Sequence, residues 1–339
     1  MAKSFKVAVV GATGLVGREM VAVLAERGFP VRELVALASE RSAGVKIEFA
    51  GDEITVKKGT PQSFAGVDIV LMSAGAAASK ELAPAAAKAG AVVIDNSSQW
   101  RMDDAVPLVV PEVNAGDVAQ HKNRGIIANP NCSTIQMVVA LNPLHQQAGL
   151  KRVVVATYQA VSGKGKLAMD ELGAQVTALF GQKDIEVAVF PKRIAFNCIP
   201  HIDVFLDDGF TKEEQKMLFE TRKIMHLPKV GVCATCVRVP VFNGHAEAVV
   251  AEFERPLLPA TARDLLRQAP GVMLMDEPKE KVYPTQLDVE DSDATFVGRI
   301  RQDTSAPNSL AFWCVANNLR KGAASNAVQI AELLARDYL

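Results

Sequence analysis

The sequence of 339 residues lacks any apolar run near the roughly 20 residues that a membrane-spanning helix needs. Its five cysteines are an odd number without the spacing of a disulfide framework, which favours a reducing, cytoplasmic setting. The formal net charge is -1, so no broad basic surface for nucleic acid or an anionic membrane is expected. A signal peptide is not expected either, because the first apolar stretch, residues 7–10, is short and soon interrupted by glycine. These absences indicate a globular protein whose partners are small molecules.

The first part of the chain alternates short apolar runs with helical patterns. Strands are expected at residues 7–10, 34–38, 68–73, 91–95 and 125–128, and helices at 15–27 and 80–89. This alternation predicts an α/β fold, a Rossmann-type parallel sheet covered by helices. The final stretch, residues 322–339, is again helical and is expected to return to this first domain.

The pattern changes after about residue 129. Helices are expected at 133–144, 167–179, 213–225 and 260–268, and strands at 152–160, 232–241, 246–254 and 310–315. This part is interpreted as an α+β domain with a largely antiparallel sheet. The expected division is residues 1–128 with 320–339 for the first domain, and 129–319 for the second.

Three glycines lie between the first strand and the first helix, in Gly11-Ala-Thr-Gly14-Leu-Val-Gly17. Glycine permits a tight turn and close backbone approach, and a helix N-terminus offers free N–H groups to a pyrophosphate. A glycine-rich turn without a ligand is the alternative. The position of these glycines at the first strand-to-helix junction favours a turn that binds a dinucleotide.

The second strand leads into Ser39-Glu40-Arg41-Ser42. An acidic residue at this place usually bonds the ribose 2′-hydroxyl of NAD, whereas an arginine accommodates the 2′-phosphate of NADP. Ser39, Arg41 and Ser42 resemble a phosphate clamp and favour NADP. Glu40 could instead bond the ribose, so an NAD site is the alternative.

Cys132 follows an apolar strand in Asn129-Pro-Asn-Cys132-Ser-Thr and is expected to begin a helix. The positive end of a helix dipole favours the thiolate, and the same N–H groups can hold an oxyanion. The alternative is a small buried cysteine. Cys233 and Cys236 have a C-x-x-C spacing within an apparent strand, where the two sulfur atoms would point to opposite faces, so no metal site is expected.

Other polar residues could serve an anionic substrate. Arg238 and His245 lie at the ends of two neighbouring strands, although a surface arginine and a solvated turn histidine are the alternative. Arg101 follows a parallel strand and could pair with a phosphate or carboxylate. Glu220 and Lys223 share a helix face, where an ordinary surface ion pair is the simpler interpretation.

Taken together, these segments resemble aspartate-β-semialdehyde dehydrogenases of the shorter bacterial form. The resemblance runs nearly end to end. It depends on the glycine turn, the Asn-Pro-Asn-Cys132-Ser-Thr segment, Tyr158-Gln159-Ala-Val-Ser-Gly163, Arg238 to Gly244-His245, and Asn317-Asn-Leu-Arg-Lys-Gly322.

The resemblance implies that NADPH reduces L-aspartyl-4-phosphate to L-aspartate-4-semialdehyde, with release of inorganic phosphate, on the route to lysine, threonine and methionine. It also implies a homodimer paired through the second domain. The implied catalytic residues are Cys132 as nucleophile, His245 as acid/base and Gln159 as orienting group. Substrate would bind Arg238 and Glu220, and phosphate would bind Arg101, Asn131, Lys223 and Lys216. The implied cofactor contacts are Gly11, Thr13, Gly14, Leu15, Val16, Ser39, Arg41, Ser42, Ser162, Gly163 and Asn317.

Three other interpretations were weighed. N-acetyl-γ-glutamyl-phosphate reductases share the architecture, but Asn131 and Ser133 flank Cys132 where those enzymes carry a glycine and an aromatic residue. Phosphorylating glyceraldehyde-3-phosphate dehydrogenases have a different nucleophile segment. A catalytically silent NADP-binding protein would not need all four of the residues Cys132, Gln159, Arg238 and His245.

Overall fold

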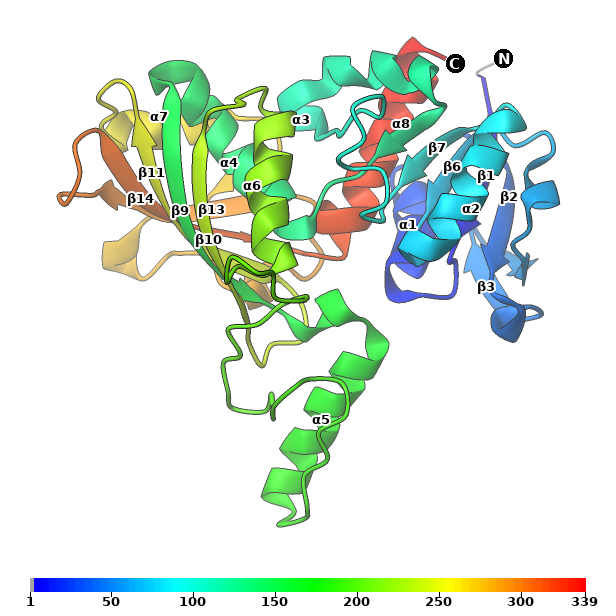
Figure 1. Cartoon of the computed structure of the whole chain (residues 1–339), viewed down its shortest axis with the longest axis horizontal. Coiled ribbons are helices and arrows are strands. Elements are labelled where there is room, and N and C mark those ends of the chain that lie inside the picture. Colours follow the sequence, from blue (N-terminus) through cyan, green and yellow to red (C-terminus); the bar gives the residue numbers. More distant parts are fainter. Residues whose placement is uncertain (1–2) are drawn as a thin grey trace. The chain divides into compact units, whose positions relative to one another are not determined.

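The computed structural model describes residues 3–339 and divides the chain into two compact units. The first unit runs to Asn131 and takes up the chain again at Ala323–Leu339, and the second is Cys132–Gly322. Figure 1 shows the C-terminal segment, in red, as a helix beside the strands of the first unit. The two junctions therefore follow Asn131 and Gly322, where the sequence had suggested 128 and 319.

The first unit contains a six-stranded sheet in the order β5-β2-β1-β6-β7-β8, with every pair parallel. Parallel strands of this kind are buried on both faces, and the strands from β6 to β8 are accordingly apolar and almost unbroken by polar residues. The strands are β1 (Phe5–Val10), β2 (Val31–Ala38), β5 (Lys57–Lys58), β6 (Ile69–Met72), β7 (Val92–Asp95) and β8 (Ile126–Ala128).

Helices cover both faces of this sheet, as the Rossmann-type prediction required. Helices α1 (Leu15–Glu26) and α8 (Ser325–Asp337) share one apolar core with alternate residues of β1 and β6. Helix α2 (Gly75–Lys88) packs along β6 and β7. The expected return of the C-terminal helix is thereby confirmed. The shorter elements are β3 (Lys46–Phe49), β4 (Asp52–Thr55), α3 (Pro111–Asn114), η1 (Glu40–Ser42), η2 (Pro61–Phe64) and η3 (Ala115–Asn123).

The second unit has a mixed six-stranded sheet in the order β10-β9-β11-β14-β13-β12. The three central pairs are antiparallel, and the two outer pairs, β10 with β9 and β12 with β13, are parallel. The largely antiparallel sheet is confirmed, although β12 and β13 were not foreseen. The strands are β9 (Leu150–Gln159), β10 (Gly231–Arg238), β11 (His245–Phe253), β12 (Val272–Leu274), β13 (Thr295–Gln302) and β14 (Ser309–Ala316).

Three helices pack on this second sheet, and a fourth projects from it (Figure 1). Helix α4 contacts the central strands, α6 lies along β10 and α7 along β13. The projecting helix, α5, has a small core of its own with the segment that follows it, centred on Leu172, Phe190 and Ile194. The helices are α4 (Cys132–Ala148), α5 (Lys166–Phe180), α6 (Lys212–Ile224) and α7 (Pro259–Gln268), joined by η4 (Val161–Lys164), η5 (Pro278–Glu280), η6 (Gln286–Val289) and η7 (Arg320–Ala324).

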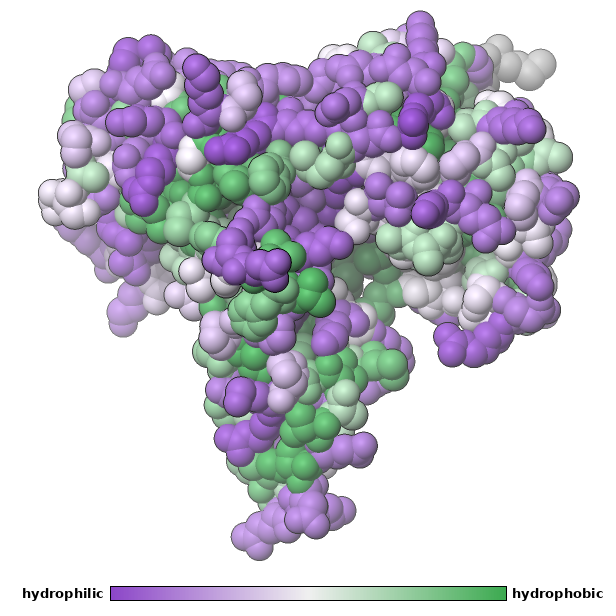
Figure 2. Space-filling model, in the orientation of Figure 1, coloured by the Kyte–Doolittle hydropathy of each residue, from purple (hydrophilic) through white to green (hydrophobic). Residues whose placement is uncertain are grey.

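The projection exposes a large apolar surface. Leu167 and Phe180 are 72% and 78% exposed, and Phe196, Val204 and Phe205 are exposed as well. Figure 2 shows hydrophobic residues gathered along this part of the molecule. Apolar surface of this extent on a folded protein marks an interaction site.

Residues 3–339 contain neither a candidate membrane span nor a candidate metal cluster. No helix there is both long enough and apolar enough to span a bilayer. Within the same range, no cluster of three or more His, Cys, Asp or Glu side chains is arranged to hold a metal ion.

Candidate active site

The glycine turn of the first unit is packed so closely that side chains could not fit. Gly11 has a φ of +84°, and a Cβ atom there would lie 2.3 Å from the carbonyl oxygen of Ser73. A Cβ atom at Gly17 would lie 2.1 Å from the oxygen of Gly11. Helix α1 begins at Leu15 with Gly14 as its N-cap and no capping side chain. The backbone N–H groups of its first turn, which includes Val16, can therefore serve an anion.

The carboxyl end of β2 leads into the 3₁₀ turn η1, with Ser39 as its N-cap. Ser39, Glu40 and Arg41 are exposed, and Ser42 is half-buried. The carboxylate of Glu40 forms an ion pair with Lys58 of the edge strand β5. Lys58 had no distinguishing signal in the sequence, because its position beside Glu40 depends on how β5 pairs with β2.

Arg101 and Asn131 both lie near the carboxyl ends of β7 and β8, and both are buried. The Nη2 of Arg101 donates to the carbonyl oxygen of Asn96, 2.9 Å away. Burial raises the pKa of Asp95, although its hydrogen bonds with Ser97 oppose this effect and its attraction to Arg101 adds a smaller opposition. The expected role of Arg101 and Asn131 as phosphate ligands stays a prediction.

In the second unit, Cys132 is the first residue of helix α4, as the sequence predicted. Its side chain is half-buried. A Cβ atom on Gly322 would lie 2.8 Å from the Cβ of Cys132, so only glycine leaves room beside the thiol. The N-terminal end of α4 and the nearby charge of Arg238 both favour a thiolate.

Three polar side chains meet at one end of the second sheet. Gln159 ends β9 and Arg238 ends β10, where the parallel register places them opposite each other. His245 begins β11, which runs antiparallel to β9, so it starts where Gln159 stops. All three side chains are buried. Residues that lie far apart in the sequence are brought together because strand ends coincide.

His245 is held in one tautomer by the backbone. Its Nδ1 accepts a hydrogen bond from the N–H of Ala160 at 3.0 Å, so the neutral ring carries its proton on Nε2. Burial, with repulsion from Arg238, lowers the pKa of His245 to about 3. A Cβ atom on Gly163 would lie 3.2 Å from Nε2, so this glycine keeps the space beside the ring open. His245 is therefore a neutral hydrogen-bond donor at physiological pH.

Arg238 supplies a fixed cation at the same place. Its Nη1 donates to the carbonyl oxygen of Ala160 at 2.6 Å. Burial lowers the pKa of Arg238, while Glu213 and Cys132 oppose that effect. Because a guanidinium stays protonated in proteins, its charge is retained.

Glu213 is the site residue that the sequence did not single out. The Nε2 of Gln159 donates to its Oε1 at 3.2 Å, and the Nζ of Lys216 to its Oε2 at 2.9 Å. Burial lowers the pKa of Lys216, but Glu213 and Asp203 outweigh it and raise that pKa overall. Glu213 therefore joins the charged part of the site.

The expected substrate residue Glu220 lies on the same buried face of α6 as Glu213, about 10 Å further along the helix axis. Gln159 and Lys216 each donate a hydrogen bond to Glu213, and Lys216 donates a second one to Asp203. Lys223 is half-buried one turn beyond Glu220. A signal existed in the sequence, because Glu213 and Lys216 have the same three-residue spacing as Glu220 and Lys223.

Ser162 and Asn317 support the loops around the site. The Nδ2 of Asn318 donates to the hydroxyl oxygen of Ser162 at 2.9 Å, and its Oδ1 accepts from the N–H of Gly244 at 2.9 Å. The Oδ1 of Asn317 accepts from the N–H groups of two residues that follow it. The cofactor contacts expected of Ser162, Gly163 and Asn317 stay predictions.

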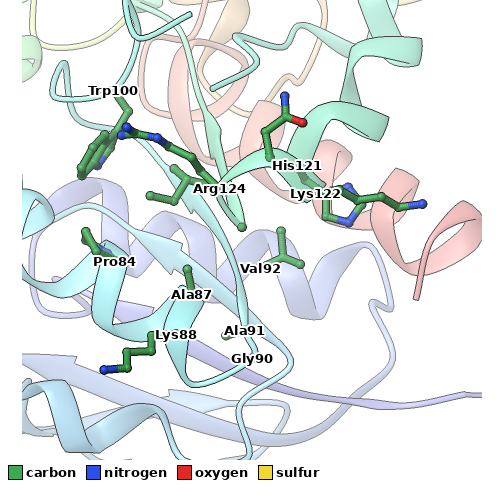
Figure 3. Close-up of a pocket in the computed structure, with 13 residues that line it drawn as sticks. Pro84, Ala87, Lys88, Gly90, Ala91, Val92, Trp100, His121, Lys122 and Arg124 are labelled. Carbon is green, nitrogen blue, oxygen red and sulfur yellow. The ribbon is translucent and has the colours of Figure 1, made fainter. Parts of the chain in front are cut away.

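A separate hollow of about 570 Å³ lies in the first unit (Figure 3). It is lined by Trp100, His121 and Arg124 and by the first residues of β7 and β8, Val92 and Ile126. Ligands of open parallel sheets bind at the carboxyl ends of the strands, which is the opposite edge. None of the expected site residues lines this hollow.

The fold is that of a two-unit dehydrogenase, in which one unit has a Rossmann-type parallel sheet and the other has a mixed sheet with Cys132 at the start of a helix. Residues 6–121 match the family model "Semialdehyde dehydrogenase, NAD binding domain", and residues 141–321 match "Semialdehyde dehydrogenase, dimerisation domain". The aspartate-semialdehyde dehydrogenase of Aquifex aeolicus is 58% identical over 337 residues, which is 99% of each chain.

Solved structures agree with these matches. Aspartate semialdehyde dehydrogenase II from Vibrio cholerae, complexed with ASA, superposes with a TM-score of 0.97, 50% identity and full coverage of both chains. The enzyme from Candida albicans, solved with NADP, has a TM-score of 0.76 and 26% identity over 98% of each chain. This chain belongs to the aspartate-semialdehyde dehydrogenase family.

Proposed function

We propose that this enzyme reduces L-aspartyl-4-phosphate to L-aspartate-4-semialdehyde with NADPH and releases inorganic phosphate. The observation that carries the proposal is the meeting of Cys132, Gln159, Arg238 and His245 within one unit, with Glu213 beside them. In metabolism the reaction would supply the precursor of lysine, threonine and methionine.

Cys132 would act first. Its thiolate attacks the acyl carbon, the bond from that carbon to the phosphate oxygen breaks, and phosphate departs with the electron pair. The N-terminus of α4 and Arg238 stabilise the thiolate without needing a base, which matters because Nε2 of His245 already carries a proton. The product is a thioester, a neutral acyl group held in place.

His245 and Gln159 would act on the acyl group. The Nε2–H of His245 can donate to the acyl oxygen as negative charge develops there, and such donors lower the barrier most when they are buried and preoriented. The acid/base role that the resemblance implies for His245 stays a prediction. Gln159 is oriented by Thr157, whose hydroxyl donates to its Oε1 at 3.0 Å, and by Glu213.

A positive and a negative side chain near Gln159 fit an amino acid substrate. Arg238 can pair with the α-carboxylate and Glu213 with the α-ammonium group. We assign to Glu213 the role that the resemblance implies for Glu220, because Nε2 of Gln159 donates a hydrogen bond to Glu213. A buried carboxylate here disfavours an N-acetylated substrate, whose nitrogen carries no charge.

Cations would hold the departing phosphate. Lys216 is favoured by its bond to Glu213, and Arg101, Asn131 and Lys223 remain the other proposed ligands. NADP would bind the turn from Gly11 to Val16, the Ser39–Arg41–Ser42 segment, and Ser162, Gly163 and Asn317. When bound, the cofactor supplies the hydride that reduces the thioester.

A homodimer is proposed through the second unit. The family model that matches it is described as a dimerisation domain, and the apolar surface of the α5 projection needs a partner. A reducing compartment such as the cytoplasm would keep the nucleophilic thiol reduced.

The test is to trap the acyl enzyme. Incubation with aspartyl phosphate without NADPH should add one aspartyl group to Cys132, seen by mass spectrometry of its peptide. Cys132→Ser should lose the adduct and lower kcat on the order of 10³-fold or more. Cys233→Ala, which alters an exposed thiol, is the matched control and should change neither. Normal turnover by Cys132→Ser, or greater activity with N-acetylglutamyl phosphate, would refute the proposal.

A further inference from the structure

The carboxylate of Glu40 is out of place in a site meant for NADP. It follows β2, where an acidic side chain normally accepts a hydrogen bond from the ribose 2′-hydroxyl of NAD and repels a 2′-phosphate. Arg41 next to it has the opposite effect. The two charges of η1 cancel, so this turn alone offers a phosphate no net attraction.

A second strand changes this balance. β5 pairs with β2 in parallel, with Lys58 in register with Ala38, the last residue of β2. The N–H of Gly59 then donates to the carbonyl oxygen of Ala38 at 2.8 Å, which fixes the two strand ends side by side. The ammonium group of Lys58 forms an ion pair with Glu40, and both side chains are largely exposed.

We propose that Lys58 is a specificity residue for the cofactor. Its ammonium group neutralises Glu40, prevents that carboxylate from serving the ribose of NAD, and gives the turn a net positive charge that attracts the 2′-phosphate of NADP. The inference depends on the proposed cofactor site, but it concerns a residue outside the glycine turn and outside η1.

The ion pair matters for specificity rather than for folding. An exposed pair contributes little to stability, because water and salt screen it. The effect on a bound 2′-phosphate is larger than the effect on stability. Without Lys58, the doubly charged phosphate would lie beside Arg41 and an uncompensated Glu40, and the charge of Glu40 would repel it directly. Removing Lys58 should therefore leave the fold intact and alter only the discrimination between nucleotides.

Equilibrium binding of two nucleotide fragments tests this without turnover. 2′,5′-ADP carries the 2′-phosphate and ADP lacks it, so calorimetric dissociation constants give a preference ratio. Lys58→Met should weaken binding of 2′,5′-ADP about fivefold to tenfold, the loss expected when one positive charge is removed near an exposed phosphate, and should leave binding of ADP unchanged or tighter. Adding Glu40→Gln to Lys58→Met should restore part of the preference, because the uncompensated carboxylate is then gone.

Lys57→Met is the matched control. Lys57 is the neighbouring lysine of the same two-residue strand, and alternation turns its side chain to the other face. Its preference ratio should equal that of the unmodified enzyme. An unchanged ratio in Lys58→Met, or an equal change in Lys57→Met, would overturn the inference alone. Failure of the unmodified enzyme to bind either fragment would instead overturn the proposed cofactor site, and equal affinity for both would overturn the NADP preference.

Discussion

Glu247 is a carboxyl group buried within the catalytic sheet, and its titration can be measured as stability. It lies two residues after His245 on β11, opposite Thr157 on β9 and Cys314 on β14, and it is 0% exposed. Within residues 3–339 neither of its oxygens has a hydrogen bond of normal geometry. Burial raises the pKa of Glu247 well above its usual value, and the proximity of Gln136 only partly opposes this. We expect a neutral acid in the folded enzyme.

The size of the pH effect on the free energy of unfolding follows from the linkage between protonation and folding. Above about pH 5 the unfolded chain has released this proton while the folded chain keeps it. The free energy of unfolding then falls by about 1.4 kcal/mol for each pH unit, until the pH reaches the raised pKa of the folded carboxyl. Glu247→Gln has nearly the same shape and no proton to lose. Its stability relative to the unmodified enzyme should therefore rise by about 1.4 kcal/mol for each pH unit above pH 5.

Urea unfolding at several pH values between 5 and 8 measures this difference, and hydrogen exchange of β11 peptides checks that the transition involves the second unit. The slope is the decisive quantity, because the amide has a desolvation cost of its own that does not depend on pH. Glu290→Gln, at an exposed carboxylate of the same unit, should give a difference that stays flat. A flat difference for Glu247→Gln as well would mean that Glu247 is ionised in the folded enzyme, and the reasoning would be refuted.

Two further substitutions test how the catalytic groups are placed. Gln286 donates from Nε2 to the carbonyl oxygens of Tyr158 at 3.0 Å and Gly244 at 2.7 Å, the residues that precede the proposed catalytic residues Gln159 and His245. Gln286→Glu keeps the shape but cannot donate, so kcat should fall about tenfold while the melting temperature changes little. A clear fall in melting temperature together with the fall in kcat would indicate general destabilisation instead. Glu213→Gln should lower kcat/KM for aspartyl phosphate on the order of 10²-fold, and Glu220→Gln far less; steady-state kinetics with the reverse ranking would restore Glu220 as the substrate residue.

Local sequence signals were enough to predict the elements of the first unit and the position of Cys132 at the start of a helix. Apolar strands followed by glycine and by helical periodicity predicted β1, its turn and α1, because each of these features depends only on neighbours in the chain. The place of Cys132 at the start of α4 could be predicted for the same reason, because Pro130 ends the preceding strand. The returning helix α8 was visible through its own periodicity.

Features that depend on pairing between distant segments could not be predicted from the sequence. Strand β13 contains charged residues at its end and reads poorly as an apolar run, and it forms because β14 pairs with it. Lys58 lies beside Glu40 only through the pairing of β5 with β2. Intrinsic strand preference is weaker than such tertiary context.

Glu213 and Glu220 are the residues for which the sequence alone predicts least. They are seven residues apart, nearly two helical turns, so both fall on the buried face of α6 and no periodicity separates them. What separates them is the tertiary contact that each makes once α6 packs on β10. The observed hydrogen bond runs from Nε2 of Gln159, the last residue of β9, to Oε1 of Glu213. The same placement puts a carboxylate near a buried arginine and histidine, where it opposes the lowering of both pKa values. One helix position thus sets the charge balance around Arg238 and His245, and it is the position that we propose for recognition of the substrate.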